Sequence, residues 1–197
     1  MTNSIKKLAG LGLMALTLSA TAAENSEIKE SSTYAGADVT ENAHFLYAGH
    51  VHAIDGDINK DGYLLRLGVG YGKYSYDTVA SPNGEVEADL GTAEIAVGYQ
   101  WLCEKNPTNR LSLYLGLNYE DHSLDFQDTN NVSRGDEIGA KVQGEAQIAL
   151  TEEITYSGLA SYSTAFDTYY TKHRATMGFD GFVAGPEFIA LGSETFD

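Results

Sequence analysis

The chain is poor in cysteine, proline and basic residues, and each shortage excludes a class of protein. Its 197 residues include one cysteine, Cys103, so no internal disulfide can form and a disulfide scaffold is excluded. Three prolines, 43% hydrophobic residues and 13 tyrosines exclude a disordered chain. Twelve Lys and Arg stand against 28 Asp and Glu, a net charge of -16, which excludes nucleic acid as a natural partner. The length fits one domain that encloses a core or a small barrel.

Long hydrophobic runs are also missing, apart from one near the N-terminus. Lys6 and Lys7 precede the apolar run from Leu8 to Leu18, and Ala20-Thr21-Ala22 supplies small residues after it. This order is typical of a cleaved secretory signal, and the run is short of the ~20 residues that a transmembrane helix needs. We therefore predict a signal peptide over 1–22, a polar leader over 23–32 and a domain over 33–197. Cleavage after residue 22 would remove two lysines and leave a chain with a net charge of -18.

The mature chain alternates between apolar side chains and polar or small ones, the pattern of half-buried β-strands. In the clearest run, Tyr63 to Tyr71, apolar side chains recur every second residue, and Arg66 and glycines occupy positions between them. Three more runs share this design, at 93–101, 111–119 and 138–148. Fainter runs at 33–40, 43–54, 154–166, 169–179 and 182–191 bring the expected total to about nine strands.

Two features favour an all-β, antiparallel up-and-down barrel of about 8–10 strands in the outer membrane of a Gram-negative bacterium. Aromatic residues end the apolar faces, where rings would lie at the boundary between water and lipid. The opposite faces carry charges that a polar lumen accepts and a dry core does not, and we assign Arg66, Glu94, Lys141 and Glu145 to that lumen. A soluble periplasmic β-sandwich or lipocalin-like barrel is the alternative. Because nine is an odd number and the last residues lack a terminal aromatic, we expect the chain to stop before its closing strand.

A candidate calcium loop precedes the clearest strand. Asp57, Asn59 and Asp61, followed by Gly62, match the first half of the D-x-N-x-D-G pattern, in which alternate oxygen side chains converge on the ion. Gly68 stands where the bidentate Glu would be, so half of the ligand set is missing. An acidic turn between two strands is the preferred interpretation.

Other polar residues give little support for catalysis or for a bound metal. The five histidines, with His50 and His52 on one strand face, lack a recognisable ligand spacing, and we interpret them as lumen or rim residues. Glu120-Asp121-His122 has acid and base groups, but no nucleophile motif such as G-x-S-x-G occurs. A carboxylate pair for glycoside hydrolysis stays open as a minor alternative. We predict a protein that is not an enzyme and needs no cofactor.

Aromatic rings beside hydroxyl and carboxylate groups suggest sugar binding at the ends of some strands. The segment 161–170 combines Tyr, Ser, Thr and Asp around one expected hairpin, and Tyr76 lies at another strand end. An aromatic girdle beside a tight turn explains the same composition and is preferred on the residues alone. The candidate glucan-binding residues are Tyr76, Glu120, Tyr162, Asp167, Tyr169 and Tyr170.

Several of these segments together resemble the BcsS family of cellulose biosynthesis proteins. The resemblance covers about 34–197 and rests on the order and spacing of the runs YAGADVT from Tyr34, DGYLLRLGVGYGKYSYDT from Asp61, YEDH from Tyr119, RGDEIGAKVQGE from Arg134, SYSTAFDTYY from Ser161 and GPEFIALGSETFD from Gly185. It implies an exported, β-rich, outer-membrane protein linked to the production or secretion of bacterial cellulose. It carries over no catalytic residue.

The resemblance and the strand pattern together lead to one functional hypothesis. We expect a non-catalytic accessory protein whose partners are cellulose or another β-glucan, the secretion components of cellulose synthase, and outer-membrane lipid. A barrel of this size has an interior nearly filled by side chains, which favours an accessory role over conduction of the polymer. The alternative is a soluble periplasmic module that binds glucan or a synthase subunit.

Overall fold

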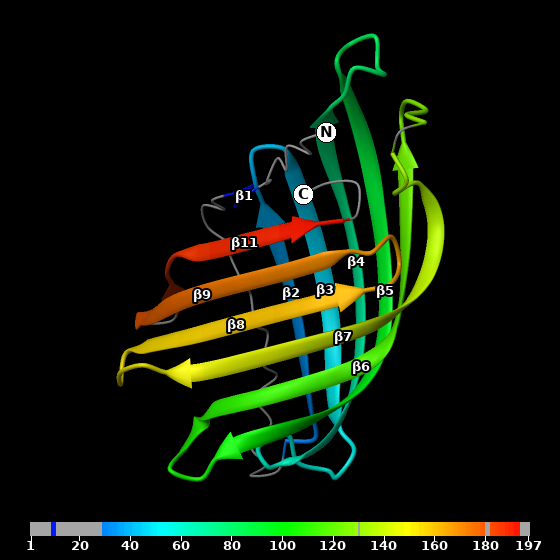
Figure 1. Ribbon diagram of the computed structural model, residues 1–197. Helices are drawn as coiled ribbons and strands as arrows, with labels where there is room; N and C mark the ends of the chain where they lie inside the picture. Colours follow the sequence, from blue (N-terminus) through cyan, green and yellow to red (C-terminus); the bar gives the residue numbers. More distant parts are fainter. Residues whose placement is uncertain (1–8, 11–28, 130, 180–181, 194–197) are drawn as a thin grey trace, which may run out of the picture.

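Antiparallel β-strands curl into a half-barrel in the structure of the chain, which is a computed structural model (Figure 1). It describes residues 9–10, 29–129, 131–179 and 182–193, and no helix occurs in these ranges. The predicted all-β, up-and-down antiparallel fold is therefore confirmed. The strands are β1 (Ala9–Gly10), β2 (Ser31–Val39), β3 (Ala43–Ala53), β4 (Gly62–Asp77), β5 (Glu85–Cys103), β6 (Asn106–Leu124), β7 (Gly135–Ala149), β8 (Ile154–Ser163), β9 (Tyr169–Phe179), β10 (Phe182–Ala184) and β11 (Glu187–Gly192).

Neighbours in the sequence are also neighbours in the sheet, from β2 through to β9. Beyond β9 the order continues with β11 and then β1, while the short β10 pairs with β9. The edges of the sheet are thus β2 and β1, and within the described ranges no backbone pairing joins them. Among these residues there is also no helix with the length and hydropathy needed to cross a membrane.

The register places the apolar residues of adjacent strands side by side on one face. Leu67 of β4 lies opposite Ile95 of β5, and Ile95 lies opposite Leu117 of β6. Because side chains alternate along a strand, a slip of one residue would turn the apolar set of that strand to the other face. This apolar face is the convex one, so most large aliphatic side chains of β4 to β7 are exposed. On the concave face, polar side chains such as Arg66, Asn118 and Gln143 are buried.

Strand boundaries differ from the sequence pattern in two ways. First, β5 and β6 have 19 residues each, well beyond the predicted 93–101 and 111–119. The ends of β6 carry polar residues on both faces, so the alternation fades there although the backbones still pair. At the start of β5 the alternation is inverted, with Val86 and Ala88 buried and Glu85 and Glu87 exposed. Second, the strand predicted over 182–191 is divided into β10 and β11, because Pro186 has no N–H for the ladder.

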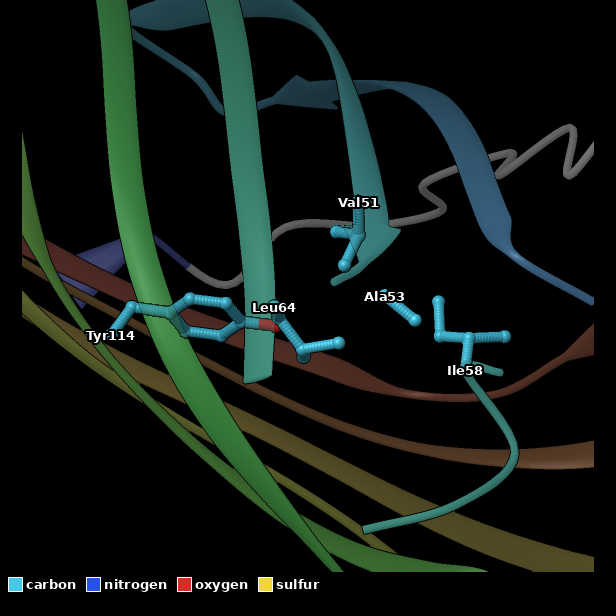
Figure 2. Packing of buried hydrophobic residues seen from close by; sticks show 5 residues of the cluster. All are labelled: Val51, Ala53, Ile58, Leu64 and Tyr114. Atoms are coloured by element: carbon cyan, nitrogen blue, oxygen red, sulfur yellow. The ribbon is translucent and has the colours of Figure 1, made fainter. Parts of the chain in front are cut away.

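A small apolar cluster lies at one end of the concave face. It consists of Val51, Ala53, Ile58, Leu64 and Tyr114, all of them buried. Figure 2 shows that Ile58, from the β3–β4 connection, lies close to Ala53 and Val51 at the end of β3, with Leu64 beside them.

The N-terminal predictions fall mainly on residues that the structure does not describe. Of the predicted signal peptide, 1–22, only Ala9 and Gly10 are described, and they pair with β11 as the short β1. The leader, 23–32, is described from Lys29 onward. The domain boundaries therefore stay predictions, and the last four residues of the chain also lie outside the described ranges.

Candidate functional site

The concave face of the half-barrel borders a cavity of about 1150 Å³, which is lined by side chains from strands β2 to β9 and β11. This volume is at the upper end of the range for small-molecule sites in proteins. Polar and charged side chains reach into the cavity because each strand turns every second residue inward. They form three networks, which we name by position as the central, the seam and the rim network.

The central network joins the four residues that the sequence assigned to the lumen. Arg66 of β4 donates from Nε to Glu94 Oε1 of β5 at 2.6 Å and from Nη1 to Glu145 Oε1 of β7 at 2.5 Å. Lys141 of β7 donates to the second Glu94 oxygen at 2.5 Å. Two carboxylates and two cations therefore satisfy one another inside the half-barrel, which offsets the cost of removing them from water.

Two tyrosine rings complete the surroundings of the Arg66 guanidinium. Its Cζ lies 5.3 Å from the centroid of the Tyr34 ring and 5.5 Å from that of the Tyr114 ring. Both distances are within the range of cation–π attraction. The guanidinium is thus held by strands β2, β4, β5, β6 and β7, and few of its orientations remain open.

The seam network connects the two ends of the sheet. Lys172 of β9 donates to Asp38 Oδ1 of β2 at 2.5 Å, and Tyr170 Oη donates to Asp38 Oδ2 at 2.9 Å. Lys172 also lies 3.6 Å from Glu187 of β11, which in turn accepts from Arg174 Nε at 2.5 Å. Side chains therefore bridge β2 to β9 and β11, although no backbone pairing between β2 and β11 is present in the described residues.

The rim network lies at the end of the cavity away from the apolar cluster. Glu120 Oε1 accepts from Asn118 Nδ2 at 2.7 Å and from Thr168 Oγ1 at 2.8 Å. Its other oxygen lies 3.5 Å from His122 Nε2, and His122 Nδ1 is 2.9 Å from Tyr74 Oη. Carboxylate, imidazole and phenol thus form a chain of hydrogen-bonding groups along the cavity wall.

The six candidate glucan-binding residues are divided between the two faces of the sheet. Tyr162 is exposed on the convex face, and its hydroxyl donates to Asp167 Oδ1 at 2.5 Å. Tyr76, Glu120 and Tyr170 line the cavity, and so does Tyr169 at the start of β9. Tyr162 and Asp167 are not part of this lining, so the six candidates do not form one binding surface.

The candidate calcium residues lie in the β3–β4 connection and serve different partners. Asp57 forms an ion pair with Lys60 at 3.1 Å and accepts from the Asn59 backbone N–H at 3.0 Å; these contacts lower its pKa. Asp61 Oδ1 instead accepts from the Leu102 backbone N–H at 2.6 Å. Within the described ranges, no group of three or more His, Cys, Asp or Glu side chains is arranged to hold a metal ion. This geometry gives the calcium hypothesis no support.

Sequence reasoning missed the seam network and the buried position of Ile58 in the β3–β4 connection. Asp38 and Lys172 do occupy inward positions of alternating segments, so their direction could have been predicted. Their contact could not, because it joins residues 134 positions apart.

Comparison with known proteins identifies the family. The family model described as cellulose biosynthesis protein BcsS matches residues 32–197, nearly all of the described half-barrel. No curated protein and no solved structure matches the chain. A family model that spans the fold from β2 onward includes all three networks of the cavity. The chain therefore belongs to the BcsS family of cellulose biosynthesis proteins, and its role lies in cellulose biosynthesis.

Proposed function

We propose that the protein is a non-catalytic accessory component of cellulose secretion that lies in the bacterial outer membrane. The observation that carries this proposal is the apolar band on the convex face of β4 to β7. The exposed large aliphatic side chains of this band range from 40% exposure for Ile148 to 69% for Ile138. A water-soluble domain would rarely leave so large a contiguous apolar surface uncovered.

The dimensions of the band fit a bilayer. From Tyr63 to Tyr71 the chain makes eight residue steps, about 26 Å along the strand and about 20 Å along the axis of a barrel with the usual tilt. The rings of Tyr63 and Tyr99 lie 5.1 Å apart, and those of Tyr99 and Trp101 lie 4.9 Å apart, at one border of the band. Such clusters are typical of the aromatic girdles of outer-membrane barrels.

The non-catalytic part of the proposal rests on the partners of the cavity side chains. Ser163 Oγ, a hydroxyl of the rim network, donates to Asn118 Oδ1 at 2.5 Å and not to an imidazole. His122 is held between Glu120 and Tyr74. No serine–histidine pair is therefore among the contacts of the rim network, and its groups serve one another.

Cell fractionation tests the location. We expect the folded protein in the outer-membrane fraction, with heat-modifiable migration on gels, because a barrel resists detergent until it is boiled. A periplasmic maltose-binding protein and an integral porin serve as the two markers. Recovery of the folded protein in the periplasmic extract would favour the soluble glucan-binding module instead.

A gene deletion tests the role in cellulose secretion. We expect less cellulose at the cell surface but unchanged synthase activity in isolated inner membranes, because an outer-membrane protein acts after polymerisation. Dye binding measures the first quantity and incorporation of labelled glucose the second. A loss of synthase activity in those membranes would show a subunit-binding role and contradict the proposal.

A further inference from the structure

The β3–β4 connection, residues 54–61, borders one end of the cavity. Ile58 of this connection is 7% exposed, packs in the apolar cluster with Val51, Ala53 and Leu64, and lines the cavity. Gln100 of β5, which is fully buried, donates from Nε2 to the carbonyls of Ile58 at 2.7 Å and Lys60 at 2.6 Å. A buried amide that satisfies two loop carbonyls holds the connection in place.

One wall of the cavity near the rim is aromatic. Phe45 of β3 lies against glycines of β4: a Cβ at Gly70 would be 2.2 Å from its ring, and one at Gly72 would be 2.6 Å from it. The ring therefore lies flat on the sheet. Tyr74 and Tyr76 continue this wall along β4, with stacked rings 6.3 Å apart. Flat rings on a cavity wall suit the apolar faces of sugars.

Three other rings of the cavity, those of Tyr34, Tyr47 and Tyr114, each have a cation beside them. Lys172 Nζ lies 4.9 Å from the centroid of the Tyr47 ring, and Arg66 lies over Tyr34. Tyr47 therefore belongs to the seam network, and Tyr34 belongs to the central network. The aromatic wall of Phe45, Tyr74 and Tyr76 lines the same cavity nearer the rim.

The facing part of the cavity near the rim is polar. Asn118 and Glu120 of β6, Ser163 of β8 and Thr168 of the following turn line the same cavity as the aromatic wall. Their amide, carboxylate and hydroxyl groups are donors and acceptors suited to sugar hydroxyls. The hydrogen bond between Tyr74 and His122 links the two walls at 2.9 Å.

The charges around the cavity favour an uncharged ligand. In the three networks, five carboxylates face four basic side chains, and the ion pairs are formed within the protein. A charged ligand that entered one of these networks would have to displace a partner and leave a partly buried charge without compensation, which is costly. A neutral polyhydroxyl ligand meets no such penalty.

We propose that the cavity is a blind pocket that binds a segment of an uncharged β-1,4-glucan between the aromatic wall of Phe45, Tyr74 and Tyr76 and the polar groups of β6 and β8. The choice of glucan rests on the proposed function, whereas the pocket and its neutrality rest on the geometry. The glucan is held and not conducted, because the connection 54–61 closes the far end.

Calorimetric titration of the purified full-length protein in detergent with cellohexaose tests the pocket. We expect saturable binding that Phe45→Ala weakens by about fivefold to 150-fold, the range known for nucleic-acid bases that stack on an aromatic side chain and used here as a guide for sugars. Phe188→Ala is the matched control, because Phe188 lies exposed on the convex face. A second variant, Phe45→Leu, keeps most of the side-chain volume and removes the ring, so weaker binding by a folded protein isolates stacking from packing.

The proposed pocket is overturned if cellohexaose shows no saturable binding. It is also overturned if Phe45→Ala and Phe188→Ala weaken cellohexaose binding equally. Binding of an anionic oligogalacturonate as tight as that of cellohexaose would overturn its selectivity for neutral ligands. The location is measured separately by fractionation. An outer-membrane protein that binds no glucan therefore contradicts the pocket alone, and a periplasmic protein that binds it contradicts the location alone.

Discussion

At the scale of single residues, leucines on the two faces of the sheet have opposite surroundings. Leu64 is 2% exposed in the apolar cluster, while Leu115, in the middle of β6, is 65% exposed on the convex face. Burial of a leucine side chain contributes roughly 1.5–3 kcal/mol relative to exposure in water. In water, the exposed leucines of the band would not gain this stabilisation. In lipid, they would gain it, because their side chains would be removed from water.

Replacement of Leu115 by Arg tests this difference. If the band lies in lipid, as we propose, the substitution should lower the free energy of unfolding by about 2–4 kcal/mol in lipid vesicles, because a charge near the bilayer midplane is destabilising. Urea titration of the folded fraction measures it. Val79→Arg is the control, since Val79 is fully exposed in the β4–β5 connection. An effect of Leu115→Arg within about 0.5 kcal/mol, as at an ordinary water-exposed site, would contradict the lipid contact.

At the scale of the strands, inward glycines allow large rings to lie flat on the wall. Gly70 and Gly72 of β4 accommodate Phe45, and Gly36 and Gly49 accommodate Tyr47 and Tyr34. A larger residue at these positions would push the rings into the cavity. The glycines thus determine how much space remains inside the half-barrel.

Two alanine substitutions separate this packing role from a general effect of glycine. A Cβ at Gly72 would lie 2.5 Å from the His44 carbonyl oxygen, so Gly72→Ala should destabilise the protein by about 1–3 kcal/mol. Nothing lies within 4 Å of a Cβ at Gly91, and Gly91→Ala should be neutral or stabilise by up to ~1 kcal/mol. Unfolding midpoints of the two variants provide the comparison. Equal midpoints would show that β3 and β4 relax around the added methyl group.

At the scale of the whole molecule, contacts between polar side chains link strands across the cavity of the curled sheet. The Asp38–Lys172 contact links β2 to β9, and the Arg66–Glu145 contact links β4 to β7. In the pocket that we propose, the connection 54–61, which contributes Ile58 to the lining, closes one end of the space that these strands surround.

Displacement of the connection 54–61 from the end of the cavity should let ions pass through the protein. Ile58→Asp places a charge in the apolar cluster, which is costly unless the charge is paired, so the connection should leave the cavity. We expect no conductance from the wild-type protein in planar lipid bilayers and measurable conductance from this variant. Ile54→Asp, in the same connection but at a side chain that is 56% exposed, should resemble the wild type. Wild-type channels of the same conductance as those of Ile58→Asp would contradict a closed end.

Much of the fold was predictable because alternation is a local property. The direction of Arg66, Glu94, Lys141 and Glu145 follows from their positions in runs of period two, and the structure turns all four inward. The strand ends were not predictable in the same way, since polar residues lie on both faces at the ends of β6 and the apolar residues at the start of β5 change to the inward face. The division of the glucan candidates between two faces was derivable from the same period, but the composition of segment 161–170 suggested one surface instead.

The sequence by itself determined that the chain forms antiparallel strands with one apolar and one polar face, because successive side chains of a strand must point to opposite sides. Only the tertiary structure decided which inward groups meet. Arg66 and Glu145 are 79 positions apart, and Asp38 and Lys172 are 134 apart, so their contacts exist only once the sheet has curled. The place of Ile58 was decided in the same way, because it becomes a buried residue only where β3, β4 and β6 bring Val51, Leu64 and Tyr114 around it.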